Sequence, residues 1–150
     1  MSTPFQLLIP RAIYDELISQ AYSELPNECC GLLAGVIVRS PGTETSSIVT
    51  AHVKCCYPLV NAAASPTEFL SDARGMFEAV REMRRQNIDI LAVYHSHPTS
   101  APIPSRTDRE RNYSSEVVNF IISLHDEKPT ARAWWLTEKD FHEADWRLTD

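Results

Sequence analysis

The order of secondary-structure elements along the chain predicts an α+β fold, with a mixed β-sheet and helices on its faces. Two strand-like segments follow each other after the first predicted helix, and three more follow one another near the C-terminus. A doubly wound α/β fold would place a helix between successive strands, whereas runs of strands are typical of α+β domains. The length of 150 residues suits one domain, which we expect to span residues 1–150.

The N-terminal part of the chain is expected to form a helix, two strands and a second helix. Apolar residues at helical spacing indicate the helices, and a continuous apolar run followed by a β-branched run indicates the strands. Ser40-Pro41-Gly42-Thr43 has turn composition and would join the strands as a hairpin, while Ser71 or Asp72 would cap the second helix. These four elements cover residues 10–25, 30–38, 47–56 and 71–86.

The C-terminal part is expected to contain four further strands and one short helix. The apolar, β-branched run at residues 88–94 is a central strand by composition. A proline-rich loop follows at residues 95–104, and a short helix is expected over residues 105–114. The last three strands are expected at residues 117–124, 131–137 and 141–148.

The composition excludes several classes of protein. The formal net charge is −6, which gives the whole chain no attraction for nucleic acid or for an anionic membrane. No apolar stretch reaches the roughly 18 residues needed to cross a bilayer, and the N-terminus lacks the basic region of a signal peptide. We therefore expect a cytoplasmic protein with neither nucleic acid nor membrane among its partners.

The four cysteines form two adjacent pairs, Cys29-Cys30 and Cys55-Cys56. Zinc-binding cysteines usually occur as C-x2-C, which this chain lacks, and disulfides are rare in a reducing compartment. Adjacent strand residues point to opposite faces of a sheet, so each pair would place one thiol on each face. We interpret all four cysteines as small strand residues.

The segment between Tyr94 and Asp108 concentrates side chains that bind metals. His95 and His97 are two residues apart at the end of a predicted strand, where residues i and i+2 point to the same face. If a helix begins near Ser105, Asp108 lies in its first turn and can face the strand end. Three protein ligands with a fourth position left for water are typical of catalytic zinc, which lowers the pKa of its bound water to about 7.

Glu28 is the candidate general base, because it precedes a predicted buried strand and has no cation near it in sequence. Taken alone, each of these candidate metal-binding and catalytic residues also has a simpler explanation. Two histidines at this spacing occur by chance, an acid such as Glu28 is more often a surface residue, and Ser105-x-x-Asp108 is a helix N-cap pattern. The joint pattern favours the functional interpretation.

These residues belong to a longer sequence pattern. Glu28 is followed by Cys30-Gly31-Leu32-Leu33-Ala34-Gly35, and His95 begins the pattern H-x-H-x7-S-x2-D. Together they resemble the JAMM (MPN+) metalloprotease family over roughly residues 24–135. Asn61-Ala62-Ala63-Ala64-Ser65-Pro66 and Tyr94-His95-Ser96-His97-Pro98 are similar to its prokaryotic branch. The resemblance implies a single MPN-like (cytidine-deaminase-like) domain with a mixed, curved sheet flanked by helices.

The resemblance also implies a site and a substrate. It implies one Zn²⁺ per chain, held by His95, His97 and Asp108, with Glu28 as general acid and base and Ser105 stabilising the oxyanion. Capping and oxyanion stabilisation compete for the Ser105 hydroxyl, and we favour the second. Family substrates are peptide or isopeptide bonds at the C-terminal tail of a ubiquitin-like or sulfur-carrier protein, and such a tail could add to a sheet edge beside the metal. A homodimer is left open.

A non-catalytic zinc-binding MPN scaffold, or protein-interaction module, is the alternative. It would bind about one zinc per chain and hydrolyse no carrier-protein adduct. Because no motif position is substituted, we favour the hydrolase over the scaffold. Two other classes of zinc hydrolase are excluded, since the sequence has neither the P-C-x-x-C of nucleobase deaminases nor the H-E-x-x-H of another protease class.

Overall fold

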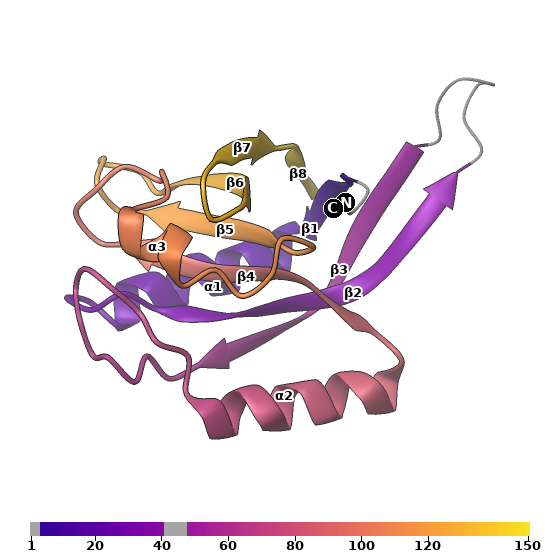
Figure 1. Cartoon of the computed structure of the whole chain (residues 1–150), viewed down its shortest axis with the longest axis horizontal. Helices are drawn as coiled ribbons and strands as arrows, with labels where there is room; N and C mark the ends of the chain where they lie inside the picture. The colour runs from indigo at the N-terminus through magenta and orange to yellow at the C-terminus, as the bar shows by residue number, and fades with distance from the viewer. Residues whose placement is uncertain (1–3, 41–47) are drawn as a thin grey trace.

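Eight strands of the described residues, 4–40 and 48–150, form one mixed β-sheet in this computed structural model (Figure 1). The strands are β1 (Gln6–Pro10), β2 (Cys30–Ser40), β3 (Ile48–Leu59), β4 (Asp89–His97), β5 (Val118–Ser123), β6 (Thr130–Leu136), β7 (Phe141–Ala144) and β8 (Trp146–Thr149). The helices are α1 (Arg11–Ser23), α2 (Ala73–Gln86) and α3 (Arg106–Glu110). In space the strands follow the order β7-β6-β5-β4-β2-β3-β1-β8.

The sheet curls until its two edge strands come together. β7 and β8 lie at opposite ends of the strand order, yet only Asp145 separates them in sequence. The Asp145 carbonyl accepts a hydrogen bond from Leu7 N of β1 over 3.0 Å, and the rings of Phe5 and Trp135 lie 4.9 Å apart between their centroids. Parallel pairs such as β4 with β5 occur beside antiparallel pairs such as β2 with β4. The predicted mixed, curved sheet is thereby confirmed.

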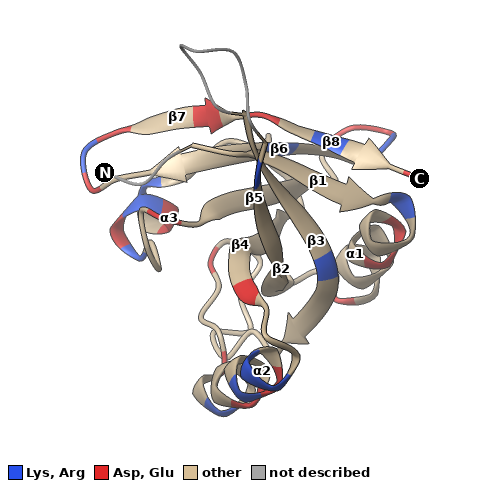
Figure 2. Cartoon of the chain, turned by 90° about the vertical axis from the view of Figure 1, so that its right-hand side faces the viewer, with Lys and Arg blue, Asp and Glu red and all other residues tan. Residues whose placement is uncertain are grey.

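Each face of the sheet is covered by one of the two longer helices. Leu33 of β2 and Leu17 of α1 belong to the same buried apolar cluster. Leu32 belongs to a second cluster, on the other face, that Met83 of α2 completes. Figure 2 shows many of the charged residues on the helices and connecting loops, with others on strands such as β3, β7 and β8. The predicted α+β architecture, with helices on the sheet faces, is confirmed.

The adjacent cysteines at the start of β2 are packed as small strand residues. Cys29 lies in the cluster under α1 and Cys30 in the cluster under α2, so the two thiols point to opposite faces. All four cysteines of the chain are free. Burial raises the pKa of Cys30 to about 11, which keeps this thiol protonated near neutral pH and agrees with a packing role.

The central strand β4 carries the predicted histidines at its C-terminal end. Tyr94 belongs to the cluster under α1, and Val93 belongs to the cluster under α2. His95 and His97 follow Val93 in steps of two, so they lie on the α2 side of the sheet. β5 pairs with β4 through His97, and β2 pairs with it as far as His95. Because both sides of β4 are occupied, a substrate tail beside the predicted metal site would not pair with this strand.

Several element boundaries differ from the sequence predictions because pairing between distant strands decides them. β1 is not predicted, since this five-residue segment pairs only with the distant strands β3 and β8. The single strand predicted at residues 141–148 is wrong, because β7 pairs with β6 and β8 pairs with β1. Pairing with β5 extends β4 to His97, and α3 ends at Glu110 rather than near residue 114.

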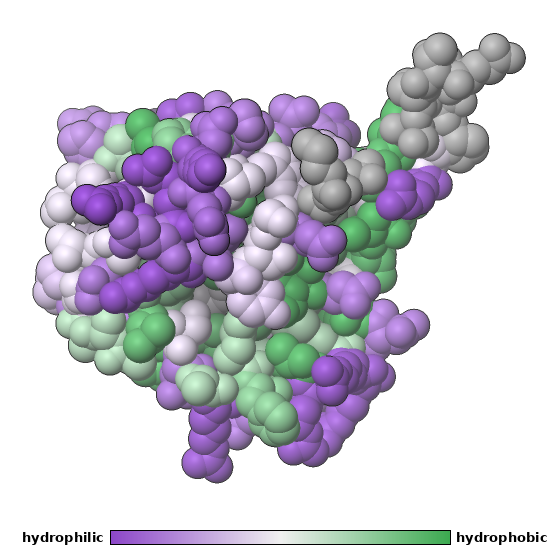
Figure 3. All heavy atoms as spheres, viewed as in Figure 1, coloured by the Kyte–Doolittle hydropathy of each residue, from purple (hydrophilic) through white to green (hydrophobic). Residues whose placement is uncertain are grey.

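The predicted hairpin is present, and it extends beyond the body of the sheet as an arm (Figure 1). Residues 41–43 of the predicted turn lie outside the described residues. Figure 3 shows apolar side chains along the arm, where Ile37 and Ile48 are exposed. Within the described part of the chain, no helix is long and apolar enough to cross a membrane.

Candidate metal centre

The end of β4 and the short helix α3 bring three potential ligands together. His95 and His97 lie at the C-terminal end of β4, and a loop leads from there to Ser105, the N-cap of α3. The cap is reciprocal, because Asp108 N donates to Ser105 Oγ at 3.1 Å and Ser105 N donates to Asp108 Oδ2 at 2.9 Å. The local sequence thus holds the Asp108 carboxylate toward the strand end.

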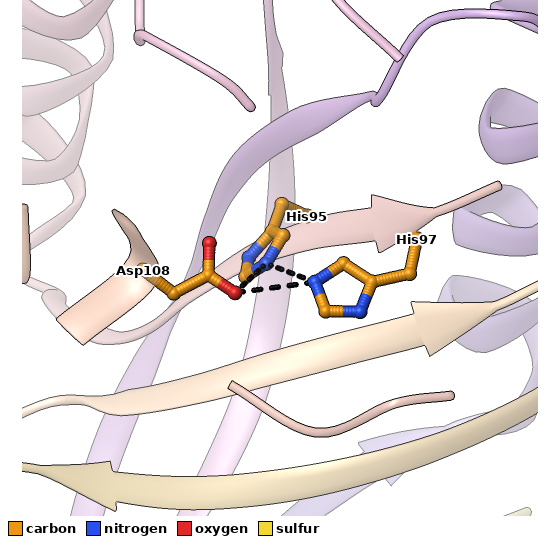
Figure 4. Close-up of side chains that lie close together, drawn as sticks. All are labelled: His95, His97 and Asp108. Atoms are coloured by element: carbon orange, nitrogen blue, oxygen red, sulfur yellow. Dashed lines mark hydrogen bonds and ion pairs between the residues drawn. The ribbon is translucent and has the colours of Figure 1, made fainter. Parts of the chain in front are cut away.

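The three ligand atoms form a nearly equilateral triangle (Figure 4). His95 Nε2 and His97 Nε2 are 3.2 Å apart, and each lies 3.1 Å from Asp108 Oδ2. All three side chains are buried. A tetrahedral zinc site with bonds of about 2.0–2.1 Å separates its ligand atoms by about 3.3 Å, so the triangle fits three corners of such a site.

The hydrogen bonds around the triangle favour a cation at its centre. His97 Nδ1 lies 2.8 Å from the carbonyl oxygen of Ala101 and donates to it, which leaves the Nε2 lone pair facing Asp108. Burial lowers the pKa of His95, which keeps that imidazole neutral. Two imidazole lone pairs and a carboxylate at this distance repel one another unless a proton or a metal ion lies between them. The donor set therefore fits a metal ion.

In the metal-free protein a shared proton can take the place of the cation. Burial alone would lower the pKa of His97, but its hydrogen bond to Asp108 outweighs burial and leaves that pKa raised. Burial would likewise raise the pKa of Asp108, but hydrogen bonds from His95 and His97 hold it well below the ordinary range. Both shifts favour a protonated His97 beside the Asp108 carboxylate anion, while His95 stays neutral.

Glu28 lies beside the triangle, just before β2. Cys29 N donates to Ser96 Oγ at 2.8 Å, and Ser96 N donates to Cys29 O at 3.1 Å. Continuing this antiparallel register by one residue places Glu28 opposite His97. Glu28 is 3% exposed, and its Oε1 has no hydrogen-bond partner among the described residues. Burial raises the pKa of Glu28 to about 8, which suits a group that must take up and release a proton.

The Ser105 hydroxyl keeps a hydrogen that it can donate. Its oxygen accepts the capping bond from Asp108 N, but a hydroxyl has one donor hydrogen in addition to its two acceptor lone pairs. Capping and donation to a substrate are therefore compatible, although the sequence suggests that they compete.

The structure brings together all five residues that the sequence nominates, and it adds neighbours that the sequence does not indicate. Phe69 stacks on His95, with ring centroids 4.5 Å apart and planes inclined by 23°. Ser96 joins β4 to the residue after Glu28. The strand alternation could have pointed to Ser96, since a polar residue between two ligands must face the opposite side. No local pattern marks Phe69.

A cavity of about 460 Å³ adjoins the triangle. Its walls are mostly apolar and come largely from α2 and the segment before it, with Phe69, Met76 and Val80 among them, and it reaches Asp108. An apolar cavity that opens onto a polar cluster is the usual form of a substrate site.

Comparison with known proteins agrees with this geometry. Residues 10–137 match the family of prokaryotic homologs of the JAB domain. The chain is 32% identical over 124 residues to a desampylase from Haloferax volcanii, covering 82% of this chain and 79% of that protein. It is 27% identical over 124 residues to the CysO-cysteine peptidase of Mycobacterium tuberculosis H37Rv, covering 83% and 77% respectively.

The fold is also shared with solved structures. The solution structure of a protein from Desulfitobacterium hafniense matches with a TM-score of 0.81 and 29% sequence identity, covering 97% of this chain and 94% of that one. The family match spans most of the chain, and one of the relatives is named as a peptidase. The chain therefore belongs to the prokaryotic homologs of the JAB domain and is a hydrolase of the JAMM type.

Proposed function

We propose that the protein is a zinc-dependent metalloprotease or isopeptidase that acts at the C-terminal tail of a ubiquitin-like or sulfur-carrier protein. The observation that carries this proposal is the buried triangle of His95, His97 and Asp108 with Glu28 beside it, whose Oε1 has no hydrogen-bond partner in the described part of the chain. Two imidazoles and one carboxylate are a donor set that suits zinc. The names of two relatives, a desampylase and a CysO-cysteine peptidase, support the substrate class.

The three ligands and Glu28 are proposed to have different chemical tasks. A zinc ion held by the three ligands would supply a Lewis acid and lower the pKa of a coordinated water. Glu28 Oε1 takes the proton that the water loses as it attacks the carbonyl carbon, and the same carboxyl then delivers it to the leaving nitrogen. No other hydrogen bond among the described residues competes for this oxygen.

Ser105 is proposed to stabilise the charge that develops on the carbonyl oxygen. The capping bond from Asp108 N holds the Ser105 oxygen in place beside the ligand residue. Its hydroxyl hydrogen then remains available for the substrate oxyanion, and a donor of this kind acts best when it is oriented before the reaction begins.

The test uses a sulfur carrier that ends in Gly-Gly, prepared with three different C-terminal attachments. These are a short peptide extension, a single cysteine, and an isopeptide link to a lysine side chain. Intact-mass spectrometry should show at least one attachment removed at the Gly-Gly end by zinc-loaded protein and none removed in a chelator. If the protein binds about one zinc and cleaves none of the three, the non-catalytic scaffold is the better description.

A further inference from the structure

Asn61 makes contacts that the proposed reaction does not by itself explain. It lies in the connection between β3 and α2 and is 8% exposed. Its Nδ2 donates to the carbonyl oxygens of Glu28 and Glu68, at 3.0 and 3.1 Å. Its Oδ1 accepts from Ala63 N and Leu70 N, at 3.0 and 2.9 Å. These four bonds use the full capacity of an asparagine side chain.

The same connection holds Glu28 through its backbone on both sides. Glu28 N donates to the carbonyl oxygen of Ser65 at 2.9 Å, and Glu28 O accepts from Asn61 Nδ2. The Glu28 carboxyl, by contrast, keeps an oxygen without a partner among the described residues. Hydrogen bonds to the charged form of a carboxyl lower its pKa and would impair a group that must be reprotonated. The orientation of Glu28 therefore has to come from its backbone.

Asn61 also connects this anchor to the opposite wall of the site. Its bonds to Glu68 O and Leu70 N lie on either side of Phe69, the ring that stacks on His95. One side chain thus ties the segment that bears Glu28 to the segment that bears Phe69. The alanines that follow Asn61 in the sequence motif are small enough for the tight turn in which Ala63 N bonds back to Asn61 Oδ1.

We infer that Asn61 is a positioning residue that orients the general base by fixing the backbone of Glu28. The inference rests on the proposed role of Glu28, and it assigns a task to the only side chain found to bond the Glu28 backbone within the described residues. Displacing a reacting group by about 1 Å costs up to about 100-fold in rate, so loss of the anchor should be visible in kcat.

The test is a double-mutant cycle on the zinc-loaded enzyme, with the extended carrier as substrate. Asn61→Ala should lower kcat by about 10- to 100-fold with KM within about twofold and zinc content unchanged, because the metal ligands lie on other elements. In the Glu28→Gln background the same change should cost less than about twofold, since the group that Asn61 positions is already lost. Equal losses in the two backgrounds would overturn the inference.

Asn112→Ala is the matched control. Its Nδ2 also donates to a backbone carbonyl, that of Leu136 at 3.1 Å, but the bond links the segment after α3 to β6 and does not involve Glu28. A loss in kcat no greater than that of Asn112→Ala would contradict the inference. Should Asn61→Ala fail to fold, Asn61→Asp keeps the acceptor that bonds Ala63 N and Leu70 N, while its ionised form cannot donate to Glu28 O. The same fall in kcat is expected.

The cycle also separates this inference from the proposed function. Full activity of Glu28→Gln would refute the role of Glu28 itself. A strongly impaired Glu28→Gln together with a fully active Asn61→Ala would refute only the positioning role of Asn61.

Discussion

Glu28 differs from an ordinary acidic residue in three ways. It is buried, its Oε1 has no partner among the described residues, and burial raises its pKa to about 8. Burying this carboxyl without a partner destabilises the folded protein, because the group loses its hydration and gains nothing in return. Such groups are concentrated at functional sites, where their pKa is matched to proton transfer.

Glu28→Gln should separate metal binding from turnover. Glutamine keeps the size of the side chain but cannot accept and return a proton, so we expect unchanged zinc content and a fall in kcat of about 100- to 10,000-fold. Zinc analysis by mass spectrometry and steady-state kinetics measure the two effects. Glu68→Gln is the control, since Glu68 lies nearby on a half-exposed part of the surface. If kcat survives in Glu28→Gln, the assignment of the base is wrong.

Ser105→Ala should lower kcat by about 100-fold, a loss typical of removing one oxyanion donor. Ser105→Thr keeps a hydroxyl at the same position and should retain most of the activity. Because Ser105 also caps the helix that carries Asp108, zinc content has to be measured in both variants. Loss of zinc in parallel with activity would show that the residue acts through Asp108 alone.

The proposed metal ligands can be predicted from the sequence because their relation is local. His95 and His97 follow strand alternation, and Asp108 follows from a helix cap in which it stands three positions after Ser105. The residues that hold Glu28 in place are not local. Asn61 is 33 residues from Glu28, and Ser96 is 67 residues from Cys29, so no spacing in the sequence relates them.

The helices and strands show the same division between local and long-range signals. α2 is predicted well because both its apolar stripe and its Asp72 cap are visible in the sequence of that segment alone. β1 and the break between β7 and β8 depend on the closure of the sheet. There Asp145 connects β7, at one edge, to β8, at the other, and its carbonyl accepts from Leu7 N. Periodicity within a segment contains no information about which edge a strand will join.

Asp72→Ala should destabilise the protein by about 1 kcal/mol, because the Asp72 carboxylate accepts from Gly75 N at 2.8 Å at the start of α2. Asp72→Asn keeps an acceptor and should cost less. Urea unfolding with a common m-value measures the difference. Equal stability of Asp72→Ala and the wild-type protein would show that the cap contributes nothing to α2.

At the scale of the whole molecule, the buried Glu28 carboxyl makes the free energy of unfolding depend on pH. The folded state raises the pKa of Glu28 from the ordinary 4.5 to about 8, so the folded protein holds this proton more tightly than the unfolded chain. Between these values the unfolded state binds fewer protons, and stability therefore falls as pH rises. The stabilisation that comes from this tighter proton binding is fully present below about pH 4.5 and is lost as the pH passes about 8.

We expect this effect in the difference between metal-free wild-type protein and metal-free Glu28→Gln. The free energy of unfolding of the wild type should decline relative to the variant by up to about 1.4 kcal/mol per pH unit through this range. Urea unfolding at a series of pH values measures it. A difference that is constant with pH, or that grows in favour of the wild type as pH rises, would show that burial does not shift the Glu28 carboxyl.

Titration of metal-free protein with zinc, with cleavage of the extended carrier followed at each addition, joins the fold, the ligand triangle and the chemistry in one measurement. Activity should be absent without metal, rise in proportion to added zinc and level off at one zinc per chain, and no such rise should occur in a His97→Ala variant. Full cleavage by the metal-free protein, or the same zinc-dependent rise in His97→Ala, would contradict a hydrolase whose metal is held by His95, His97 and Asp108.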